Sequence, residues 1–438
     1  MGRASTADLF EAAVRAGSVT TDTRNAPKGS VFFALKGERF NGNDYALRAL
    51  ELGCGKAVVD EDRPEFQGPD YFHVEDVLTS LQEVARMYRR TWNFPVFGLT
   101  GSNGKTTTKE LIHAVLQQGF PGARATRGNL NNEIGVPLTL LEIPADAGFA
   151  VIEMGANAQR EIARLAEIAE PTHGLITNIG KAHLEGFGGP EGVKAGKREL
   201  FQHIGTTGGT VFVHAGNPVL REISEGLTRV LYGTAEHPPV GTLDDTSEGP
   251  VLRWTGPDGR AHGPVAMHLS GDHNLENVLA AIAVGLHFGV TAVQCTLAVS
   301  GYQPRNNRSE WRQTRRNSVL LDAYNANPSS MEHAIAHFAG LPQLEKAPGF
   351  VVLGDMAELG EYSPQEHARI AALFEETGIE GMCVGPEFAA VVSGKGNVSS
   401  CLSPEEARGI LAAKALTGRT VLLKGSRSSA LEGLLDVL

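Results

Sequence analysis

The alternation of short apolar runs with polar turns divides the chain into three successive regions. In the first region, residues 1–92, apolar runs at 31–35 and 57–59 predict strands, and residues 78–92 have the spacing of an amphipathic helix. This pattern predicts a small α/β domain that closes with a helix. The Asn-Phe-Pro sequence at 93–95 marks the junction with the next domain.

The second and third regions show the same alternation of strands and helices. Residues 93–300 contain buried strands at 149–152 and 174–179 and a strongly apolar helix that ends near residue 288, which predicts a mainly parallel sheet with helices on both faces. From residue 301 to residue 438 the pattern restarts as a second open, Rossmann-like α/β sheet. The strands predicted there lie at 318–321, 350–353, 381–384 and 420–423.

A phosphate-binding loop organises the second region. The sequence PVFGLTGSNGKTTTK at 95–109 is an apolar strand, a glycine-rich turn and the start of a helix that runs to about Gln118. The turn residues are Gly101, Ser102, Asn103, Gly104, Lys105, Thr106 and Thr107. The glycines let backbone amides turn toward a polyanion, while a lysine contacts the β- and γ-phosphates and the next hydroxyl binds Mg²⁺. The general motif has an early glycine where this chain has Leu99. The departure limits the match to a smaller group of phosphate-binding loops.

The composition excludes several classes of partner. The formal net charge of −11 disfavours nucleic acid and anionic membrane surfaces. The four cysteines are far apart and have no paired metal-site spacing, so free thiols in a reducing compartment are expected. The N-terminus lacks a basic, apolar leader, and no apolar run reaches the length of about 18 residues that spans a bilayer. We therefore expect a soluble cytoplasmic protein without membrane insertion.

Polar residues follow two strands of the second region. Glu153 ends the strand at 149–152, where a carboxylate beside a phosphate loop would contact Mg²⁺, although a solvated strand end also fits. His183 lies in a glycine-bracketed loop just after the strand at 174–179. Both a packed histidine and a metal or phosphate contact are compatible with that position.

Further polar residues have equally open interpretations on their own. Lys194 and Lys197, in the helix after the His183 loop, have the pattern of a solvated helical face. Asn129, Asn131 and Asn132 occupy a turn-rich stretch, where amides either cap local backbone or line a polar ligand.

Seven motifs together resemble one family. In order, they are TGSNGKTTT, EMGAN, TNIGKAHLEGF, GDHNLENVLAA, DAYNANPSSM, LGDMAELG and LLKGSR. Their order and separations over about residues 20–430 are similar to those of the Mur ligases of bacterial peptidoglycan synthesis. DAYNANP together with LGDMAELG matches the branch that joins D-alanyl-D-alanine to UDP-N-acetylmuramoyl-tripeptide.

The resemblance implies an architecture and a reaction. Residues 1–92 would bind the UDP-linked substrate, 93–300 would bind ATP, and 301–438 would form the Rossmann-like ligase domain. ATP would phosphorylate the terminal carboxylate of the tripeptide, and the amine of D-alanyl-D-alanine would attack the acyl phosphate. Two Mg²⁺ ions are implied, and we expect a monomer that closes on its substrates about a hinge near 301–304.

The resemblance also assigns roles to individual residues. Lys105, His183, Lys197 and Arg308 match catalytic positions, with Lys197 rather than Lys194 at the lysine that is commonly carbamylated. The metal ligands would be Thr106, Glu153, His183 and Lys197. Beyond the loop at 101–107, the nucleotide-binding positions are Asn274, Asn277, Arg308, Asp322 and Asn325. The UDP-substrate positions are Thr23, Arg24, Asn41, Gly42, Asn43, Asn129, Asn131 and Asn132.

Two features depart from the family pattern or leave another explanation open. Many members have a glycine before the arginine, where this chain reads Asn306-Asn307-Arg308, so the shape of that loop is in question. Arg24 lies two residues from Asp22, and by itself this pair has the pattern of a surface ion pair.

Three other functions share some of these sequence features. A Mur-type ligase with a different acceptor would share the same nucleotide and metal positions. A P-loop kinase or nucleotide switch is disfavoured because the chain lacks an evident Asn-Lys-x-Asp motif and carries a further α/β domain. A non-enzymatic scaffold is disfavoured because Lys105, Thr106, Glu153 and His183 are all present.

Overall fold

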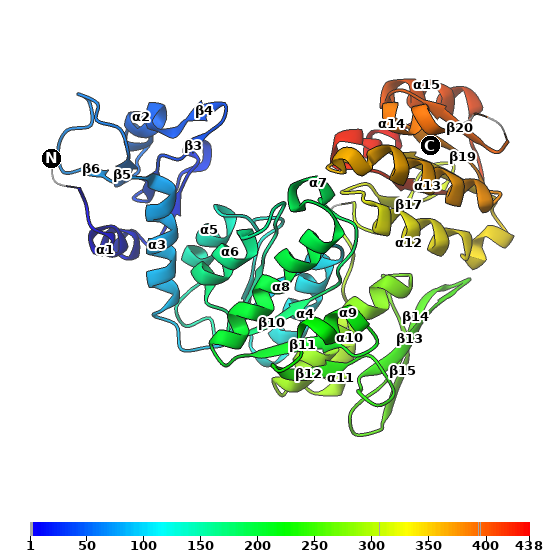
Figure 1. Ribbon diagram of the computed structural model, residues 1–438, viewed down its shortest axis with the longest axis horizontal. Coiled ribbons are helices and arrows are strands. Elements are labelled where there is room, and N and C mark those ends of the chain that lie inside the picture. Colours follow the sequence, from blue (N-terminus) through cyan, green and yellow to red (C-terminus); the bar gives the residue numbers. More distant parts are fainter. Residues whose placement is uncertain (1–2, 306, 393, 395) are drawn as a thin grey trace.

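Three α/β domains follow one another along the longest axis of the computed structural model, with the central domain between the two terminal ones (Figure 1). The structure describes residues 3–305, 307–392, 394 and 396–438. Asn306, which belongs to the motif before Arg308, lies outside the described residues. The expected α/β fold with three domains is confirmed.

The N-terminal domain is a four-stranded parallel sheet of order β1-β2-β5-β6 with helices on both faces. Its strands are β1 (Val19–Thr20), β2 (Val31–Phe33), β5 (Lys56–Val59) and β6 (Tyr71–His73). One face packs on α1 (Thr6–Ala16) and α3 (Val77–Arg89), the other on α2 (Ala46–Glu51). The hairpin of β3 (Lys36–Gly37) and β4 (Phe40–Asn41), with the 3-10 turns η1 (Thr23–Asn25) and η2 (Gly42–Tyr45), carries the predicted UDP-substrate residues of this domain.

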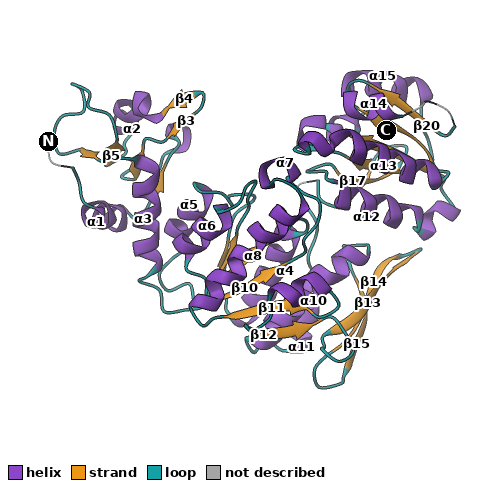
Figure 2. Ribbon diagram, in the orientation of Figure 1, coloured by secondary structure: helices purple, strands orange, loops and turns teal. Residues whose placement is uncertain are grey.

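The central domain is built on a six-stranded, wholly parallel sheet of order β12-β11-β10-β7-β9-β8. Its strands are β7 (Val96–Thr100), β8 (Arg124–Ala125), β9 (Ala150–Glu153), β10 (His173–Ile176), β11 (Thr210–His214) and β12 (Thr228–Tyr232). One face packs on α4 (Lys105–Gly119), α10 (Asp272–His287) and α11 (Ala292–Ser300), the other on α5 (Gly135–Glu142), α6 (Glu161–Ala169) and α8 (Pro190–Thr206) (Figure 2). The short helices α7 (Leu184–Phe187) and α9 (Pro218–Ile223) complete it. The phosphate loop leaves β7, which lies inside this sheet.

The central domain also contains a sheet that the sequence did not predict. Strands β13 (Val240–Thr246), β14 (Gly249–Thr255) and β15 (Ala261–Ala266) form an antiparallel sheet. It buries few residues, chiefly Leu243, Leu252 and Trp254, against the helical layer that contains α10. Most of its other side chains are at least partly exposed, so its apolar pattern is too sparse to indicate strands.

The C-terminal domain has a six-stranded sheet of order β16-β17-β21-β18-β19-β20, in which β16 is antiparallel to β17 and the other neighbours are parallel. The strands are β16 (Glu310–Gln313), β17 (Ser318–Asp322), β18 (Gly349–Gly354), β19 (Glu380–Val384), β20 (Val398–Cys401) and β21 (Thr420–Lys424). The helices are α12 (Pro328–Ala339), α13 (Ser363–Glu376), α14 (Pro386–Val391) and α15 (Pro404–Lys414), and the 3-10 turns are η3 (Pro342–Glu345), η4 (Gly360–Tyr362), η5 (Arg427–Ser429) and η6 (Leu431–Leu434). The four predicted strands are confirmed, whereas β16 and β20 were not predicted.

Direct contacts join the C-terminal domain to the central domain. The Asn327 amide donates to Oδ1 of Asn103 in the phosphate loop at 2.7 Å. Further away, Nε2 of His337 on α12 lies 2.8 Å from Oδ2 of Asp245 on β13. The loop that follows β17 therefore lies against the phosphate loop.

The N-terminal domain is joined to the central domain chiefly by α3, which packs on α5 and α6. Nε of Arg89 donates to the carbonyl oxygen of Ala169 at 2.9 Å, and the Arg164 guanidinium donates to Gln82 at 2.7 Å. Across the described part of the chain, no helix is both long and apolar enough to cross a bilayer.

Candidate active site

The phosphate loop is shaped by two glycines and by the segment that follows β10. Gly101 and Gly104 have φ angles of 150° and 76°, in the range that glycine tolerates best. A Cβ on Gly101 would lie 1.9 Å from Oγ1 of Thr177, so a side chain there would displace the loop. The amides of Ser102 and Asn103 donate to the backbone and side-chain oxygens of Asn178, each at 3.0 Å.

These contacts refine the expectation that the loop amides hold phosphate. The Ser102 and Asn103 amides are already paired with Asn178. The N-terminal amides of α4, in contrast, have no acceptor within the helix, as at every helix start. The first turn, with Lys105, Thr106 and Thr107, is therefore the part of the loop best placed to receive an anion.

The Lys105 ammonium lies folded over this turn. Its Nζ donates to the carbonyl oxygens of Gly101 at 2.8 Å and Ser102 at 3.2 Å. Burial lowers the pKa of Lys105 to about 8, and the nearby positive charge of Arg308 acts in the same direction, while Glu153 opposes both. An anion at this position would stabilise the charged lysine.

Glu153 is the buried carboxylate of the site, at the carboxyl end of β9. Its Oε1 accepts from the Thr106 hydroxyl at 3.2 Å and from the Asn131 amide at 2.7 Å. Its Oε2 has no hydrogen bond within the described residues, and Nζ of Lys109 lies 3.6 Å from it. Lys109, which the sequence did not single out, is buried, and burial lowers its pKa.

The next loop brings His183 to the same edge of the sheet. His183 has a left-handed backbone, with φ of 55°, immediately before α7. Its Nδ1 contacts Oε2 of Glu358, from the loop after β18 in the C-terminal domain. In the same loop, the Lys181 ammonium pairs with Glu366 on α13. Sequence reasoning quoted the motif that contains Glu358 but gave this residue no role.

The two lysines of α8 have different environments. Lys194 makes a solvent-facing ion pair, with Nζ 2.8 Å from Oε1 of Glu222. Lys197 is fully buried, with Nζ 3.4 Å from the carbonyl oxygen of Ala156 and 4.9 Å from the ring centre of Phe187. Burial holds the pKa of Lys197 well below its usual range, and the charge of Lys105 adds to this effect.

Arg308 reaches the site from the segment that links the central and C-terminal domains. Its guanidinium carbon lies 3.6 Å from the ring centre of Tyr324, a cation–π contact that orients it. Asn307 before it has φ of 58°, and Ser309 after it has φ of 49°. Asparagine adopts left-handed backbone more readily than most residues, which explains how the loop forms without a glycine.

The end of β17 carries the predicted ribose-side residues. Oδ2 of Asp322 lies 2.9 Å from Nζ of Lys424, which also donates to the carbonyl oxygen of Asn325 at 2.6 Å. The side-chain oxygen of Asn325 accepts from the amide of Ala326 at 2.9 Å. Lys424, which ends β21, therefore holds both predicted residues at the carboxyl edge of the sheet.

Asn274 and Asn277, at the start of α10, are buried and bonded to each other. The Asn277 amide donates to Oδ1 of Asn274 at 3.1 Å, and Oδ1 of Asn277 accepts from the Thr108 hydroxyl at 2.9 Å. A Cβ on Gly104 would lie 2.7 Å from Oδ1 of Asn277. The pair therefore packs against Gly104 of the phosphate loop and holds Thr108 of α4, a structural role that the sequence did not indicate.

The asparagines after β8 have separate tasks. Asn131 binds Glu153, as described above. Oδ1 of Asn132 accepts from the amide of Gly135 at 2.9 Å and so holds the start of α5. Asn129 is exposed. Local capping accounts for Asn132, whereas Asn131 belongs to the candidate site.

The predicted UDP-substrate residues of the N-terminal domain lie on the rim that carries η1, β4 and η2. Arg24 pairs with Asp22 on the surface at 2.6 Å, and Thr23 begins η1 beside them. Asn43 is buried and its amide donates to Oδ1 of Asp60 at 2.8 Å. The Asn41 amide donates to Glu61 at 2.8 Å, and a Cβ on Gly42 would meet the carbonyl oxygen of Leu35 at 2.4 Å. These contacts fix the shape of the loop.

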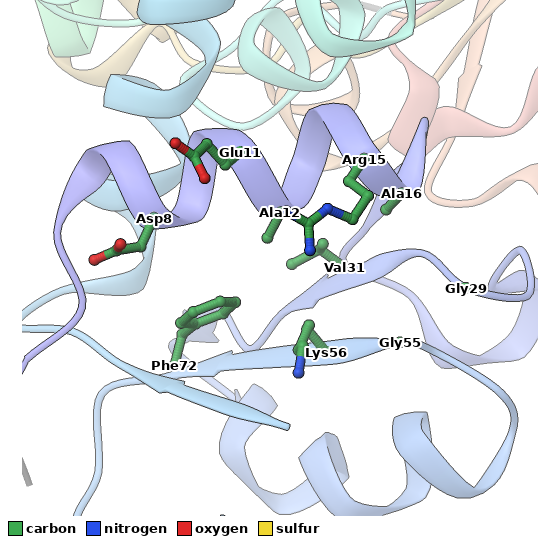
Figure 3. A pocket seen from close by; sticks show the side chains of 10 residues that line it. All are labelled: Asp8, Glu11, Ala12, Arg15, Ala16, Gly29, Val31, Gly55, Lys56 and Phe72. Atoms are coloured by element: carbon green, nitrogen blue, oxygen red, sulfur yellow. The ribbon is translucent and has the colours of Figure 1, made fainter. Parts of the chain in front are cut away.

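Two open cavities lie away from the phosphate loop. One, of about 430 Å³, lies in the N-terminal domain between α1, which contributes Ala12 and Arg15, and the sheet, which contributes Val31 and Phe72 (Figure 3). The other, of about 340 Å³, is in the C-terminal domain and is lined in part by Tyr324. Neither of these two cavities is lined by Lys105, Thr106 or Glu153.

The gathered groups are suited to phosphoryl chemistry. Lys105 and Arg308 supply positive charge, and Thr106 and Glu153 supply oxygen ligands for a hard cation. Within the described residues, no cluster of three or more His, Cys, Asp or Glu side chains could hold a metal ion. A cation here would therefore need the Thr106 hydroxyl and oxygens from a ligand or a modified side chain.

Two family models match the chain. The one described as "Mur ligase middle domain" matches residues 99–285, and the one described as "Mur ligase, glutamate ligase domain" matches residues 307–427. A Synechocystis protein named UDP-N-acetylmuramoyl-tripeptide--D-alanyl-D-alanine ligase is 37% identical over 443 residues, covering 97% of this chain and 92% of that protein.

Two solved structures share the whole architecture. MurF from Acinetobacter baumannii has a TM-score of 0.86 at 30% identity, covering 96% of this chain and 92% of that one. The MurF ligase of Thermotoga maritima, solved in complex with ADP, has a TM-score of 0.85 at 26% identity, covering 96% of each chain.

Proposed function

This chain belongs to the Mur ligase family, and we propose that it joins D-alanyl-D-alanine to UDP-N-acetylmuramoyl-tripeptide at the expense of ATP. The products are UDP-N-acetylmuramoyl-pentapeptide, ADP and phosphate. The observation that carries the proposal is near-complete alignment with relatives named for this reaction, together with the phosphate loop beside Glu153. The reaction belongs to peptidoglycan precursor synthesis, and we expect the protein to act in the cytoplasm.

The reaction needs activation because a carboxylate and an amine do not condense in water. ATP phosphorylates the terminal carboxylate of the tripeptide, and the dipeptide amine attacks the resulting acyl phosphate and expels phosphate. Such a reaction depends on positioning and charge stabilisation more than on a protein nucleophile. Lys105 and the first turn of α4 hold the β- and γ-phosphates, and Arg308 offsets the charge of the transferring group.

The donor set fits Mg²⁺, which prefers oxygen ligands and octahedral geometry. The observation that supports a cation is the buried Glu153 Oε2, which has no hydrogen bond within the described residues. Thr106 and Glu153 would hold one ion, and His183 and Lys197 would contribute to a second. Bound Mg²⁺ neutralises phosphate charge during transfer.

Lys197 is suited to carbamylation. Burial lowers the pKa of Lys197 and so favours its uncharged amine, which is the form that adds to CO₂. The carbamate would replace a cation by a carboxylate-like oxygen ligand near Ala156, which follows the Glu153 strand. Lys194, which is paired with Glu222 at the surface, has no comparable environment.

The nucleoside and the UDP-substrate lie on opposite sides of this centre. Asn274, Asn277, Asp322 and Asn325 line the adenosine side, where the first two also support the loop from behind. Thr23, Arg24, Asn41, Gly42 and Asn43 would form the uridine-diphosphate rim, and Asn129, Asn131 and Asn132 would complete the UDP-substrate site. We expect the protein to act as a monomer without nucleic-acid partners.

The test is phosphate release from ATP, with UDP-N-acetylmuramoyl-tripeptide and D-alanyl-D-alanine each left out in turn. Release that requires both, with a product heavier by the dipeptide, supports the proposal. Release that requires a different amine would keep the ATP chemistry and overturn the acceptor. Lys105→Ala is the matched control: it should abolish turnover in a folded protein, and activity above about a tenth of normal would contradict the role of the loop.

A further inference from the structure

Glu358 brings a carboxylate from the C-terminal domain into the catalytic centre. It follows β18, its side chain is 50% exposed, and its Oε2 contacts Nδ1 of His183 beside α7. The Glu358 carbonyl oxygen also accepts from the amide of Glu185 at 3.3 Å. In Figure 1, α7 lies at the side of the central domain that faces the C-terminal domain.

The backbone of Glu358 is unusual for its residue type. Its φ of 61° is left-handed, which costs free energy for a residue that is neither glycine nor asparagine. Gly360, two residues later, is also left-handed, and a Cβ there would lie 3.1 Å from Cβ of Glu185. The loop is therefore held in a conformation that directs Glu358 toward the His183 loop.

Three other carboxylates near the centre lie beside lysine or arginine side chains. Glu153 lies beside Lys109, Asp322 pairs with Lys424, and Glu366 pairs with Lys181 and Arg369. Among the described residues, Glu358 pairs with a histidine instead, and no lysine or arginine lies within ion-pair distance of it. The loop that carries His183 is bonded to the phosphate loop, because the Ser102 hydroxyl donates to the carbonyl oxygen of Gly180 at 3.1 Å. The contact with His183 therefore places Glu358 near the phosphate loop.

We propose that the carboxylate of Glu358 binds the ammonium group of the acceptor dipeptide and holds it beside the acyl phosphate. Once this group has lost a proton to solvent, the neutral amine attacks the acyl carbon, the new C–N bond forms and phosphate leaves. The inference rests on the proposed function, because it assigns the amine end of the acceptor in that reaction. An α-amino group has a pKa near 8, so the dipeptide arrives mostly as a cation at neutral pH. A carboxylate is its natural partner, through short charge-assisted hydrogen bonds.

The location of Glu358 explains why such a residue should belong to the C-terminal domain. The acceptor must bind beside a phosphate group, where Lys105 and Arg308 would repel a cation. A carboxylate carried on the other domain supplies local negative charge when the two domains meet. Orientation of the amine at the reacting carbon then contributes to the rate.

The test compares Glu358→Gln with the control Glu361→Gln, which changes an exposed carboxylate on η4 three residues away. Glutamine keeps the shape of the side chain and removes its charge. The first measurement is the KM for D-alanyl-D-alanine at saturating ATP and UDP-substrate. The second is hydroxamate formation from UDP-substrate, ATP and hydroxylamine, a nucleophile that is uncharged at neutral pH.

For Glu358→Gln we expect a KM for the dipeptide raised about 10- to 100-fold, as for loss of a charged hydrogen bond. Hydroxamate formation should stay within about twofold of the wild type, because acyl phosphate formation does not involve the ammonium. Glu361→Gln should match the wild type in both assays. If Glu358 had only a structural role, Glu358→Gln would lower the rate of ligation and the rate of hydroxamate formation together.

Two results would overturn the inference. One is an unchanged dipeptide KM in Glu358→Gln. The other is parallel loss of hydroxamate formation and ligation in a variant whose melting temperature is normal, which would place Glu358 in phosphoryl transfer. A wild-type enzyme that forms hydroxamate but ignores D-alanyl-D-alanine would instead overturn the proposed acceptor, so the two failures are distinguishable.

Discussion

The hydroxyl of Thr106 donates a 3.2 Å hydrogen bond to Oε1 of Glu153, which joins the first turn of α4 to the carboxyl end of β9. The two residues are 47 positions apart and lie on neighbouring strand–loop units of the central sheet. Both are buried, and together they provide a hydroxyl and a carboxylate at the point where the phosphates are expected. This pairing is the structural basis of the proposed Mg²⁺ position.

Glu153→Gln tests that position. The amide retains the shape of the side chain but loses the charge that would hold a divalent cation. We expect turnover to fall by about 100-fold and the Mg²⁺ concentration for half-maximal activity to rise. Steady-state rates over a Mg²⁺ titration measure both effects. An unchanged Mg²⁺ dependence would assign Glu153 to the packing of Lys109 and Asn131 instead.

Lys197 and Lys194 form a matched pair for testing carbamylation. Lys197→Ala should lower activity by about 100-fold or more, because it removes a metal ligand, whereas Lys194→Ala should retain it. In the wild type, removal of dissolved CO₂ should lower activity, and bicarbonate should restore it. Equal losses in the two alanine variants, or activity that is indifferent to CO₂, would contradict the assignment.

His273 makes stability depend on pH. Burial lowers its pKa from 6.5 to about 4, helped by His337 and His333, while Asp322 opposes the shift. The unfolded chain therefore binds more protons than the folded one between these values, so stability is present above pH 6.5 and is lost as the pH falls toward 4.

The measurement is the apparent free energy of unfolding of the wild type and of His273→Asn at pH 7.5 and at pH 5. The wild type should lose about 2 kcal/mol more than the variant over this interval, because about 1.5 pH units of it lie below the unfolded-state pKa. The comparison isolates His273 because other buried histidines contribute equally to both proteins. Parallel curves for the two proteins would show that the pKa of His273 is the same in the folded and unfolded states.

Local chemistry explains what could be predicted from the sequence. The β7-loop-α4 unit could be predicted because its glycines, lysine and threonines, at their fixed spacing, indicate a phosphate-binding loop without reference to distant residues. Lys109 was missed because it lies one helical turn after Lys105, where a lysine normally faces solvent. Its burial depends on Glu153 and on the Gly128 carbonyl oxygen, which Nζ reaches at 2.9 Å.

Contacts between domains could not be predicted from local pattern. The pairing of His183 with Glu358 joins residues from two separate sheets, and either residue alone fits a solvated loop. The β13–β15 sheet was missed because its charged side chains, such as Asp244 and Arg253, pair on the surface and interrupt the apolar alternation. In both cases the tertiary structure supplies the partner that the sequence does not reveal.

The contact between Asp245 and His337 allows a test of closure between the central and C-terminal domains. This contact, at 2.8 Å, holds α12 of the C-terminal domain against the β13–β14 hairpin, remote from the phosphate loop. Asp245→Asn should weaken it by about 1 kcal/mol, which shifts the balance between joined and separated domains about fivefold. Asp244→Asn is the control, because Asp244 pairs with Arg253 inside the hairpin at 2.8 Å.

Small-angle scattering measures the outcome. The wild type should become more compact when an ATP analogue and the UDP-substrate bind together, since the N-terminal domain and the C-terminal domain must both reach the phosphate loop. Asp245→Asn should be more extended than Asp244→Asn without ligands and equally compact with both ligands bound, because substrate contacts then replace the lost pair. Unchanged dimensions of the wild type on binding would contradict a hinge at 301–304 and would mean that the ligand-free arrangement is already the catalytic one.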